Sequence, residues 1–186
     1  MDREHTFLDT NIIIRFLTSD DLKKQEAAAA LFERIEKKEE MVYAPESVIC
    51  DAVFVLASPK HYNKSREQIR DLLFPLVSLE NLKISNRRVL LRALDIYVAY
   101  PIDFSDALLK ATMEAADAQI IYSYDTDFDR FSDITRKESE EPRQEKKLRR
   151  KQHKLPGAFR PVLAYMTIVH RWPWTVEYSR RPTVLC

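Results

Sequence analysis

Short apolar runs alternate with longer amphipathic segments over the first 130 residues of the chain. Four runs have the length and composition of buried strands, and they lie at 6–8, 41–44, 82–84 and 119–124. Segments whose apolar residues recur every three or four positions predict helices at 10–17, 21–38, 47–56, 65–78, 86–99 and 104–116. Because strands alternate with helices throughout, the pattern favours an α/β fold with a central parallel sheet covered on both faces.

Polar residues and prolines refine the expected helix boundaries. Thr10 and Asn11 are both suited to cap the first helix, and the pair Asp20-Asp21 is suited to cap the second. Pro75 lies inside the fourth predicted helix, so we expect a bend or an early end there.

The chain divides into a domain-sized body and a short extension. With 186 residues it suits one domain with an appendage, so we assign residues 1–136 to a folded domain and residues 137–186 to a linker and C-terminal extension. The linker at 137–154 is almost free of apolar residues, which predicts a disordered or helical charged segment. The rest contains Trp172 and Trp174 without a clear period, and it could be a native extension or a frame-shifted end.

The net charge of +1 hides an asymmetry between these two parts. Residues 1–136 hold 18 Lys and Arg against 24 Asp and Glu, a net charge of −6, and residues 137–186 hold 12 against 5, a net charge of +7. The charged N-terminus lacks the apolar core of a signal peptide, and no apolar run approaches the roughly 20 residues of a membrane span. Cys50 and Cys186 form no disulfide or metal-binding pattern. We therefore expect a cytoplasmic protein with no membrane partner.

Glycine is almost absent from the chain. Gly157 is the only one, so the predicted domain contains none. Nucleotide-binding P-loops, dinucleotide-binding GxGxxG loops and the GxSxG turn of serine hydrolases all need glycine at fixed positions. The composition therefore excludes these common constructions.

Carboxylates occur at positions where an apolar environment disfavours them. Asp9 follows the first predicted strand, Asp51 is the lone charge in an otherwise apolar helix, and Asp125 follows the strand QIIYSY. Asp103 and Asp106 open the helix after a proline. Because the carboxyl ends of parallel strands and the starts of the following helices share one edge of a sheet, we expect Asp9, Asp106 and Asp125 to converge.

Several carboxylates in one place repel one another, and a divalent cation relieves that repulsion at neutral pH. Clustered carboxylate oxygens suit one or two Mg²⁺ or Mn²⁺ ions, with water and substrate phosphate as the remaining ligands. Such an ion lowers the pKa of bound water and stabilises charge on phosphoryl oxygens. The pattern therefore predicts hydrolysis of phosphodiester bonds.

These carboxylates also have purely structural interpretations. Asp9 and Asp103 are suited to cap the helices that follow them, and Asp125 with Asp127 is suited to form a turn. Asp51 could be a solvated helix residue, and the charged linker could be solvated without any binding function.

Four segments together resemble a known family of nucleases. They are FLDTNIIIRFL at 7–17, SVICDAVFVL at 47–56, DFSDALLKA at 103–111 and YSYDTDF at 122–128. In order and spacing they are similar to the motifs of PIN-domain ribonucleases, and above all to the VapC-type toxins of bacterial and archaeal toxin–antitoxin pairs. The resemblance covers about residues 6–131 and implies a three-layer α/β/α fold, binding of Mg²⁺ or Mn²⁺, and cleavage of RNA. It also implies a homodimer and a cognate antitoxin that covers the active-site groove.

The resemblance also assigns roles to individual residues. It implies four residues that bind metal and take part in catalysis: Asp9, Asp51, Asp106 and Asp125. It implies supporting roles for residues beside them in the same motifs: Thr10, Asn11, Asp103, Ser123 and Asp127.

One of the four departs from the family pattern. The family normally has glutamate where Asp51 stands, six residues after a proline such as Pro45. Aspartate is one methylene shorter, which moves its oxygens back by about 1.5 Å, so we expect weaker activity or a preference for Mn²⁺. Glu46 is an alternative ligand, although a glutamate at a helix start also suits the helix dipole.

Binding of RNA needs positive charge near the scissile phosphate. Lys110 lies one helical turn after Asp106, and Arg15 projects from the first helix. Both are candidate phosphate contacts, with solvation as the simpler role for each. The basic linker would add affinity that does not depend on RNA sequence.

Two other functions are alternatives to a nuclease on the sequence alone. An aspartyl-phosphate protein, such as a dehalogenase-type phosphatase or a receiver domain, needs a second aspartate near the nucleophile or an acidic pair before the phosphorylated strand, and the segment Asp9-Thr10-Asn11 offers neither. A catalytically weakened PIN-like module that binds RNA or a protein is favoured by Asp51 and by the unusual C-terminal extension.

Overall fold

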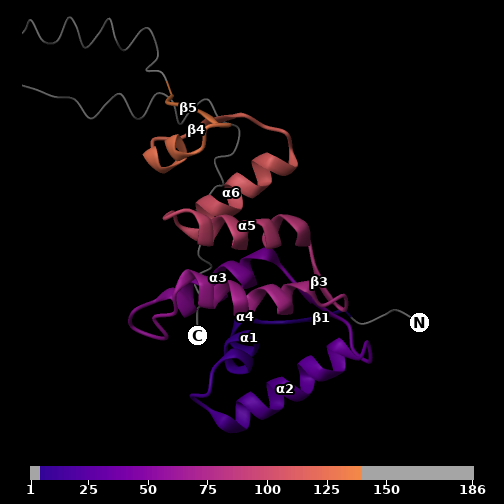
Figure 1. Cartoon of the computed structure of the whole chain (residues 1–186). Helices are drawn as coiled ribbons and strands as arrows, with labels where there is room; N and C mark the ends of the chain where they lie inside the picture. Colours follow the sequence, from indigo (N-terminus) through magenta and orange to yellow (C-terminus); the bar gives the residue numbers. More distant parts are fainter. Residues whose placement is uncertain (1–4, 140–186) are drawn as a thin grey trace, which may run out of the picture. The chain divides into compact units, whose positions relative to one another are not determined.

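The computed structural model describes residues 5–139, and its helices and strands alternate as the sequence predicts (Figure 1). The strands are β1 (Thr6–Phe7), β2 (Val42–Ala44), β3 (Leu82–Ile84), β4 (Ile120–Tyr122) and β5 (Thr135–Lys137). The helices are α1 (Thr10–Leu17), α2 (Leu22–Glu36), α3 (Glu46–Ala57), α4 (Arg66–Ser78), α5 (Arg87–Ala99), α6 (Phe104–Ala115) and the 3₁₀ helix η1 (Thr126–Arg130). The predicted α/β fold is confirmed, and none of the described helices is long and apolar enough to cross a membrane.

The strands pair in parallel, but they form two sheets. In one sheet the order is β1-β2-β3, and in the other β4 pairs with β5. The predicted domain boundary after residue 136 falls inside β5, where Lys137 pairs with Tyr122 of β4. The polar residues of β5 give no strand signal in the sequence, so this strand was not predicted. The predicted linker at 137–154 therefore begins one residue too early, since Lys137 belongs to β5, and its residues 140–154 lie outside the described residues with the rest of the C-terminal extension.

Pro75 interrupts α4 less than we expected. The helix continues from Arg66 to Ser78. The proline removes one backbone donor near the end of the helix, whereas Leu73 and Leu76 on either side of it are buried in the core. Packing of these apolar side chains outweighs the local penalty, so the expectation of an early end was wrong.

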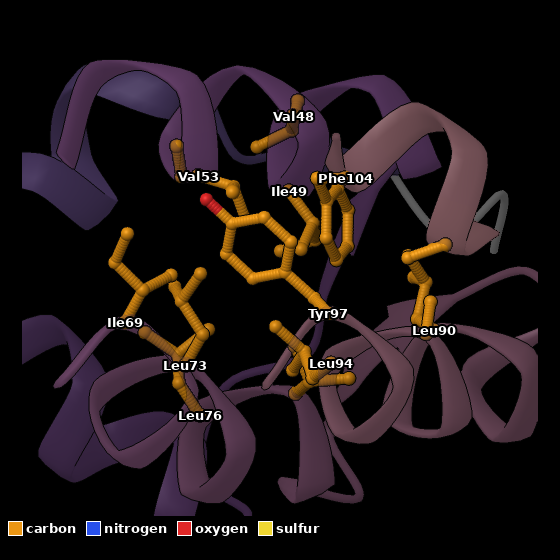
Figure 2. Packing of buried hydrophobic residues seen from close by; sticks show 14 of the residues in the cluster. Val48, Ile49, Val53, Ile69, Leu73, Leu76, Leu90, Leu94, Tyr97 and Phe104 are labelled. Atoms are coloured by element: carbon orange, nitrogen blue, oxygen red, sulfur yellow. The ribbon is translucent and has the colours of Figure 1, made fainter. Parts of the chain in front are cut away.

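The core that positions α6 lies among α3, α4 and α5 (Figure 2). Ile49 of α3 and Leu73 of α4 are fully buried, and the ring of Tyr97 from α5 lies between these helices. The Tyr97 ring meets the ring of Phe104 edge-on, with 5.6 Å between the centroids. Because Phe104 is the first residue of α6, this contact sets the point at which the helix begins, two residues before Asp106.

Arg66 holds the turn between α5 and α6. Its guanidinium donates to the carbonyl oxygens of Tyr97 at 2.9 Å, Tyr100 at 3.0 Å and Ile102. Carbonyl groups at the end of a helix have no partner within that helix, so one cation satisfies several acceptors here. The guanidinium also lies 4.3 Å from the centroid of the Tyr97 ring. The start of α6 is therefore fixed by polar and apolar contacts together.

We expect Arg66→Met to lower the free energy of unfolding by about 2–3 kcal/mol, because it leaves these carbonyl oxygens without a charged donor. Urea denaturation of the full chain measures this change. Arg88→Met is the matched control, since Arg88 is exposed on α5 and has no hydrogen-bond partner in the described part of the chain. Equal effects of the two substitutions would contradict the role assigned to Arg66.

Candidate metal centre

Three aspartates from two segments come together beside the start of α6. Asp106 lies in the first turn of α6, Asp125 caps η1, and Asp127 lies in the first turn of η1. One carboxylate oxygen from each residue lies within 4.8 Å of the other two. Within residues 5–139, no other group of three acidic, histidine or cysteine side chains is close enough to hold a metal ion. We call these three residues the aspartate cluster.

Local hydrogen bonds shape the η1 side of the cluster. The carboxylate of Asp125 accepts from the backbone N–H of Asp127 at 2.9 Å. The backbone N–H of Asp125 donates to the hydroxyl of Ser123 at 3.0 Å. The predicted turn at Asp125 and Asp127 is thus confirmed, and it brings both side chains to the same end of η1. The turn uses one oxygen of Asp125, so the other oxygen is not committed to it.

The electrostatics of the cluster disfavour three negative charges. The pKa of Asp106 is raised above its usual value, first by burial and then by the negative charges of Asp125, Asp103 and Asp127. Asp103 is the N-cap residue of α6, but its side chain makes no capping hydrogen bond. All four carboxylates therefore add to the negative potential at this helix start.

The donor set fits a hard divalent cation. All three groups offer carboxylate oxygens, the ligands that Mg²⁺ and Mn²⁺ prefer. Asp106 and Asp127 are half-buried and Asp125 is exposed, which leaves one side of the cluster open to water and to a phosphate group. A cation at this place would favour the ionised form of Asp106 that burial and its neighbours disfavour.

Arg130 is a functional candidate that the sequence did not indicate. Its Nε donates to Oδ1 of Asp127 at 3.1 Å, and its side chain is 48% exposed. The guanidinium thus lies at the edge of the aspartate cluster, where it can reach a bound phosphate. Asp127 and Arg130 are three residues apart, a spacing that brings side chains together in a helical turn. Because no helix was predicted at η1, this pair was missed.

The structure does not bring Asp9 into the cluster. Asp9 follows β1, whereas Asp125 follows β4, and these strands belong to different sheets. The structure groups Asp106 and Asp125 with Asp127 but does not include Asp9 within that 4.8 Å group, so the convergence of Asp9 with them stays a prediction. Asp9 instead caps α1 and accepts from Nδ2 of Asn11 at 2.9 Å. The hydroxyl of Thr10 donates to the carbonyl of Val48 at 3.4 Å, which links α1 to α3.

Asp51 also lies outside the cluster. It is exposed, and Phe54, one turn further along α3, is 76% exposed. This face of α3 points to solvent although its residues are largely apolar, so the expectation that apolar neighbours would bury Asp51 was wrong. Glu46, the alternative ligand, accepts from Nδ2 of Asn86 at 2.8 Å instead.

The two basic residues proposed to contact phosphate both have acidic partners. Arg15 pairs with Asp20 and is partly exposed, so its role is still a prediction. Lys110 is only 3% exposed, and its ammonium pairs with Glu114 and Asp133. A phosphate contact would require breaking two ion pairs and exposing a buried group, so the structure argues against that role for Lys110.

Comparison with known families covers the same region. A family model described as PIN domain matches residues 6–134, which include the whole aspartate cluster. No curated protein matches the chain.

In EDTA at pH 7, we expect Asp106→Asn to raise the urea midpoint of unfolding, because it removes a charge that its surroundings disfavour. The sign follows from the raised pKa: the folded protein holds this proton more tightly than the unfolded chain, so ionisation of Asp106 costs stability as the pH rises. The increase in the urea midpoint should disappear at a pH where carboxyl groups are protonated. In saturating Mn²⁺ the wild type should have the higher midpoint, because its folded state binds the ion more tightly than that of Asp106→Asn. Glu26→Gln on the exposed face of α2 is the control. A lower midpoint in EDTA would contradict the described electrostatics.

Proposed function

The chain belongs to the PIN domain family, and from this premise we propose that it is a metal-dependent endoribonuclease that hydrolyses phosphodiester bonds in RNA. The family is generally one of nucleases with a divalent metal at an acidic site. The observation that carries the proposal is the aspartate cluster, which lies inside the matched region and offers three carboxylate oxygens within 4.8 Å of one another.

We assign the metal-binding role to Asp106, Asp125 and Asp127. A bound Mg²⁺ or Mn²⁺ supplies an acidified water molecule and stabilises negative charge on the phosphate. A bound cation would favour the ionised form of Asp106, against the burial and the neighbouring negative charges that raise its pKa. Arg130 is bonded to Asp127 at the edge of the cluster, where its guanidinium would donate to a phosphate oxygen of a bound RNA.

Asp9 and Asp51 are the further ligands that the family resemblance assigns. Neither residue belongs to the group of carboxylates that lie within 4.8 Å of one another. We propose that the three clustered aspartates form the minimal metal site. Asp9 and Asp51 would add further ligands to this site, as the family resemblance implies.

We further propose that the protein is the toxin of a type II toxin–antitoxin pair, active as a homodimer and silenced by a cognate antitoxin. This rests on the order and spacing of the four motifs, which are most similar to those of VapC-type toxins. A second function, that of a catalytically weakened module which binds RNA or a protein, is favoured by the position of Asp9 and Asp51 outside the cluster.

We expect the purified full chain to cleave structured RNA in Mg²⁺ or Mn²⁺ and to stop in EDTA. Asp106→Asn should lower kcat/KM by at least about 100-fold, because a metal ligand supplies several kcal/mol of transition-state stabilisation. Glu26→Gln should cleave like the wild type. Equal cleavage by the wild type and Asp106→Asn would show that a contaminating nuclease is responsible.

Two further variants test whether the metal site extends beyond the three clustered aspartates. Asp9→Asn should remove cleavage if Asp9 joins the metal site during turnover, and should leave it intact if the three clustered aspartates suffice. Asp51→Glu should leave the rate unchanged, because Asp51 is not among the clustered carboxylates. A marked gain from Asp51→Glu would place residue 51 at the metal and contradict the minimal site.

Arg130→Gln should weaken binding of RNA to a similar extent for all sequences and reduce the slope of log Kobs against log salt by about 0.7–0.9, the contribution of one phosphate contact. Fluorescence anisotropy at several salt concentrations, in Ca²⁺ to prevent cleavage, measures this slope. Arg34→Gln is the matched control, because Arg34 also pairs with a carboxylate but lies on α2. An unchanged slope in Arg130→Gln would exclude the contact.

A further inference from the structure

Lys110 carries a buried positive charge close to the aspartate cluster. Its side chain is among the few buried polar ones of the described part of the chain. Its Nζ lies 2.8 Å from Oε1 of Glu114 and 2.6 Å from Oδ2 of Asp133. It also lies 5.3 Å from the centroid of the Phe131 ring. Every polar contact of this ammonium therefore goes to α6 or to the segment that follows η1.

The buried ammonium stays charged. Burial alone would lower the pKa of Lys110, but hydrogen bonds to Asp133 and Glu114 hold it above its usual value. Glu114 also accepts from Arg92 of α5, and the hydrogen bonds from Arg92 and Lys110 lower its pKa to about 2 although burial opposes this. The four groups Arg92, Glu114, Lys110 and Asp133 balance in charge, which offsets the cost of burying an ion.

This network of charged side chains links the two segments that form the aspartate cluster, α6 and the η1 segment. Lys110 lies one helical turn after Asp106, on the same face of α6. Asp133 lies beyond the C-terminal end of η1, whereas Asp125 and Asp127 lie at its N-terminal end. The Lys110–Asp133 pair therefore joins the helix that carries one clustered aspartate to the segment that carries the other two.

The η1 segment needs a favourable contact with α6 to stay beside it. The clustered carboxylates, with oxygens within 4.8 Å of one another, repel one another when no cation is present. Without an opposing contact, the η1 segment would relax away from α6 and widen the cluster. Burial of Phe128 and Phe131, which are 2% and 4% exposed, holds this segment in place, and the Lys110–Asp133 pair adds a directional contact.

We propose that Lys110 is a positioning residue for the metal site: its ion pair with Asp133 holds the η1 segment against α6 and so preorganises the aspartate cluster for a divalent cation. The proposal rests on the metal-dependent function above. It gives Lys110 a part in metal affinity without any contact to the ion or to RNA.

The test compares variants of the full chain by two measurements. Calorimetry gives the Kd for Mn²⁺, and hydrogen–deuterium exchange gives the protection of residues 123–135. Lys110→Met keeps the length and apolar stem of the side chain, Lys110→Arg keeps the charge, and Asp133→Asn removes the pair from its exposed side. Lys37→Met is the matched control, because Lys37 pairs with Glu33 at the same helical spacing on α2.

We expect Lys110→Met and Asp133→Asn each to raise the Kd for Mn²⁺ by about 10–100-fold, the usual effect of losing a residue that orients a metal ligand. Exchange should become faster at residues 123–135 and stay unchanged in α2. Lys110→Arg should recover most of the affinity, and Lys37→Met should bind like the wild type. A combined Lys110→Met and Asp133→Asn variant should be no weaker than either alone, since both remove one interaction.

An unchanged Kd in Lys110→Met or in Asp133→Asn would overturn the proposal, even if the variant is less stable, because Lys110 would then serve the fold alone. If Lys110→Met fails to fold, Asp133→Asn decides by the same criterion, since Asp133 is 62% exposed on its side chain. A wild type that binds no Mn²⁺ would overturn the proposed function itself. In that case the exchange data still show whether the pair holds the η1 segment.

Discussion

Mutual repulsion among carboxylates is the constraint on which this structure depends. Asp106, Asp125 and Asp127 come within 4.8 Å of one another although they belong to two separate segments. Like charges at such a distance would drive the segments apart unless other contacts hold them. Holding the three carboxylates this close lowers the stability of the folded chain, and favourable packing elsewhere offsets that loss. A divalent cation bound between these carboxylates would relieve the repulsion.

The contacts that oppose the repulsion act from both sides of the cluster. On the α6 side, Phe104 packs against Tyr97 and Arg66 binds the carbonyl groups of the preceding turn, so the start of the helix is fixed. On the η1 side, buried phenylalanines and the Lys110–Asp133 pair hold the segment. The contacts of Arg66 and the Lys110–Asp133 pair join residues distant in sequence, so the site depends on the tertiary fold rather than on any one motif.

Periodicity predicted the order of helices and strands because each helix and most strands bury one apolar face, as at Ile49 and Leu73. The cluster was only partly predictable. Asp106 and Asp125 followed from their places at a helix start and after a strand. The sequence placed Asp9 with these residues, but the cluster does not include it, and pairing between distant strands leaves no local signal. Arg130 was missed and Lys110 was misjudged because their partners depend on η1 and on burial, which the polar segment after β4 does not indicate.

The most direct test of the central claim is anomalous diffraction from crystals of the full chain grown with Mn²⁺. The account predicts an anomalous peak within coordination distance of carboxylate oxygens from Asp106, Asp125 and Asp127. A peak bound by other residues, or no peak at the cluster under saturating Mn²⁺, would contradict it.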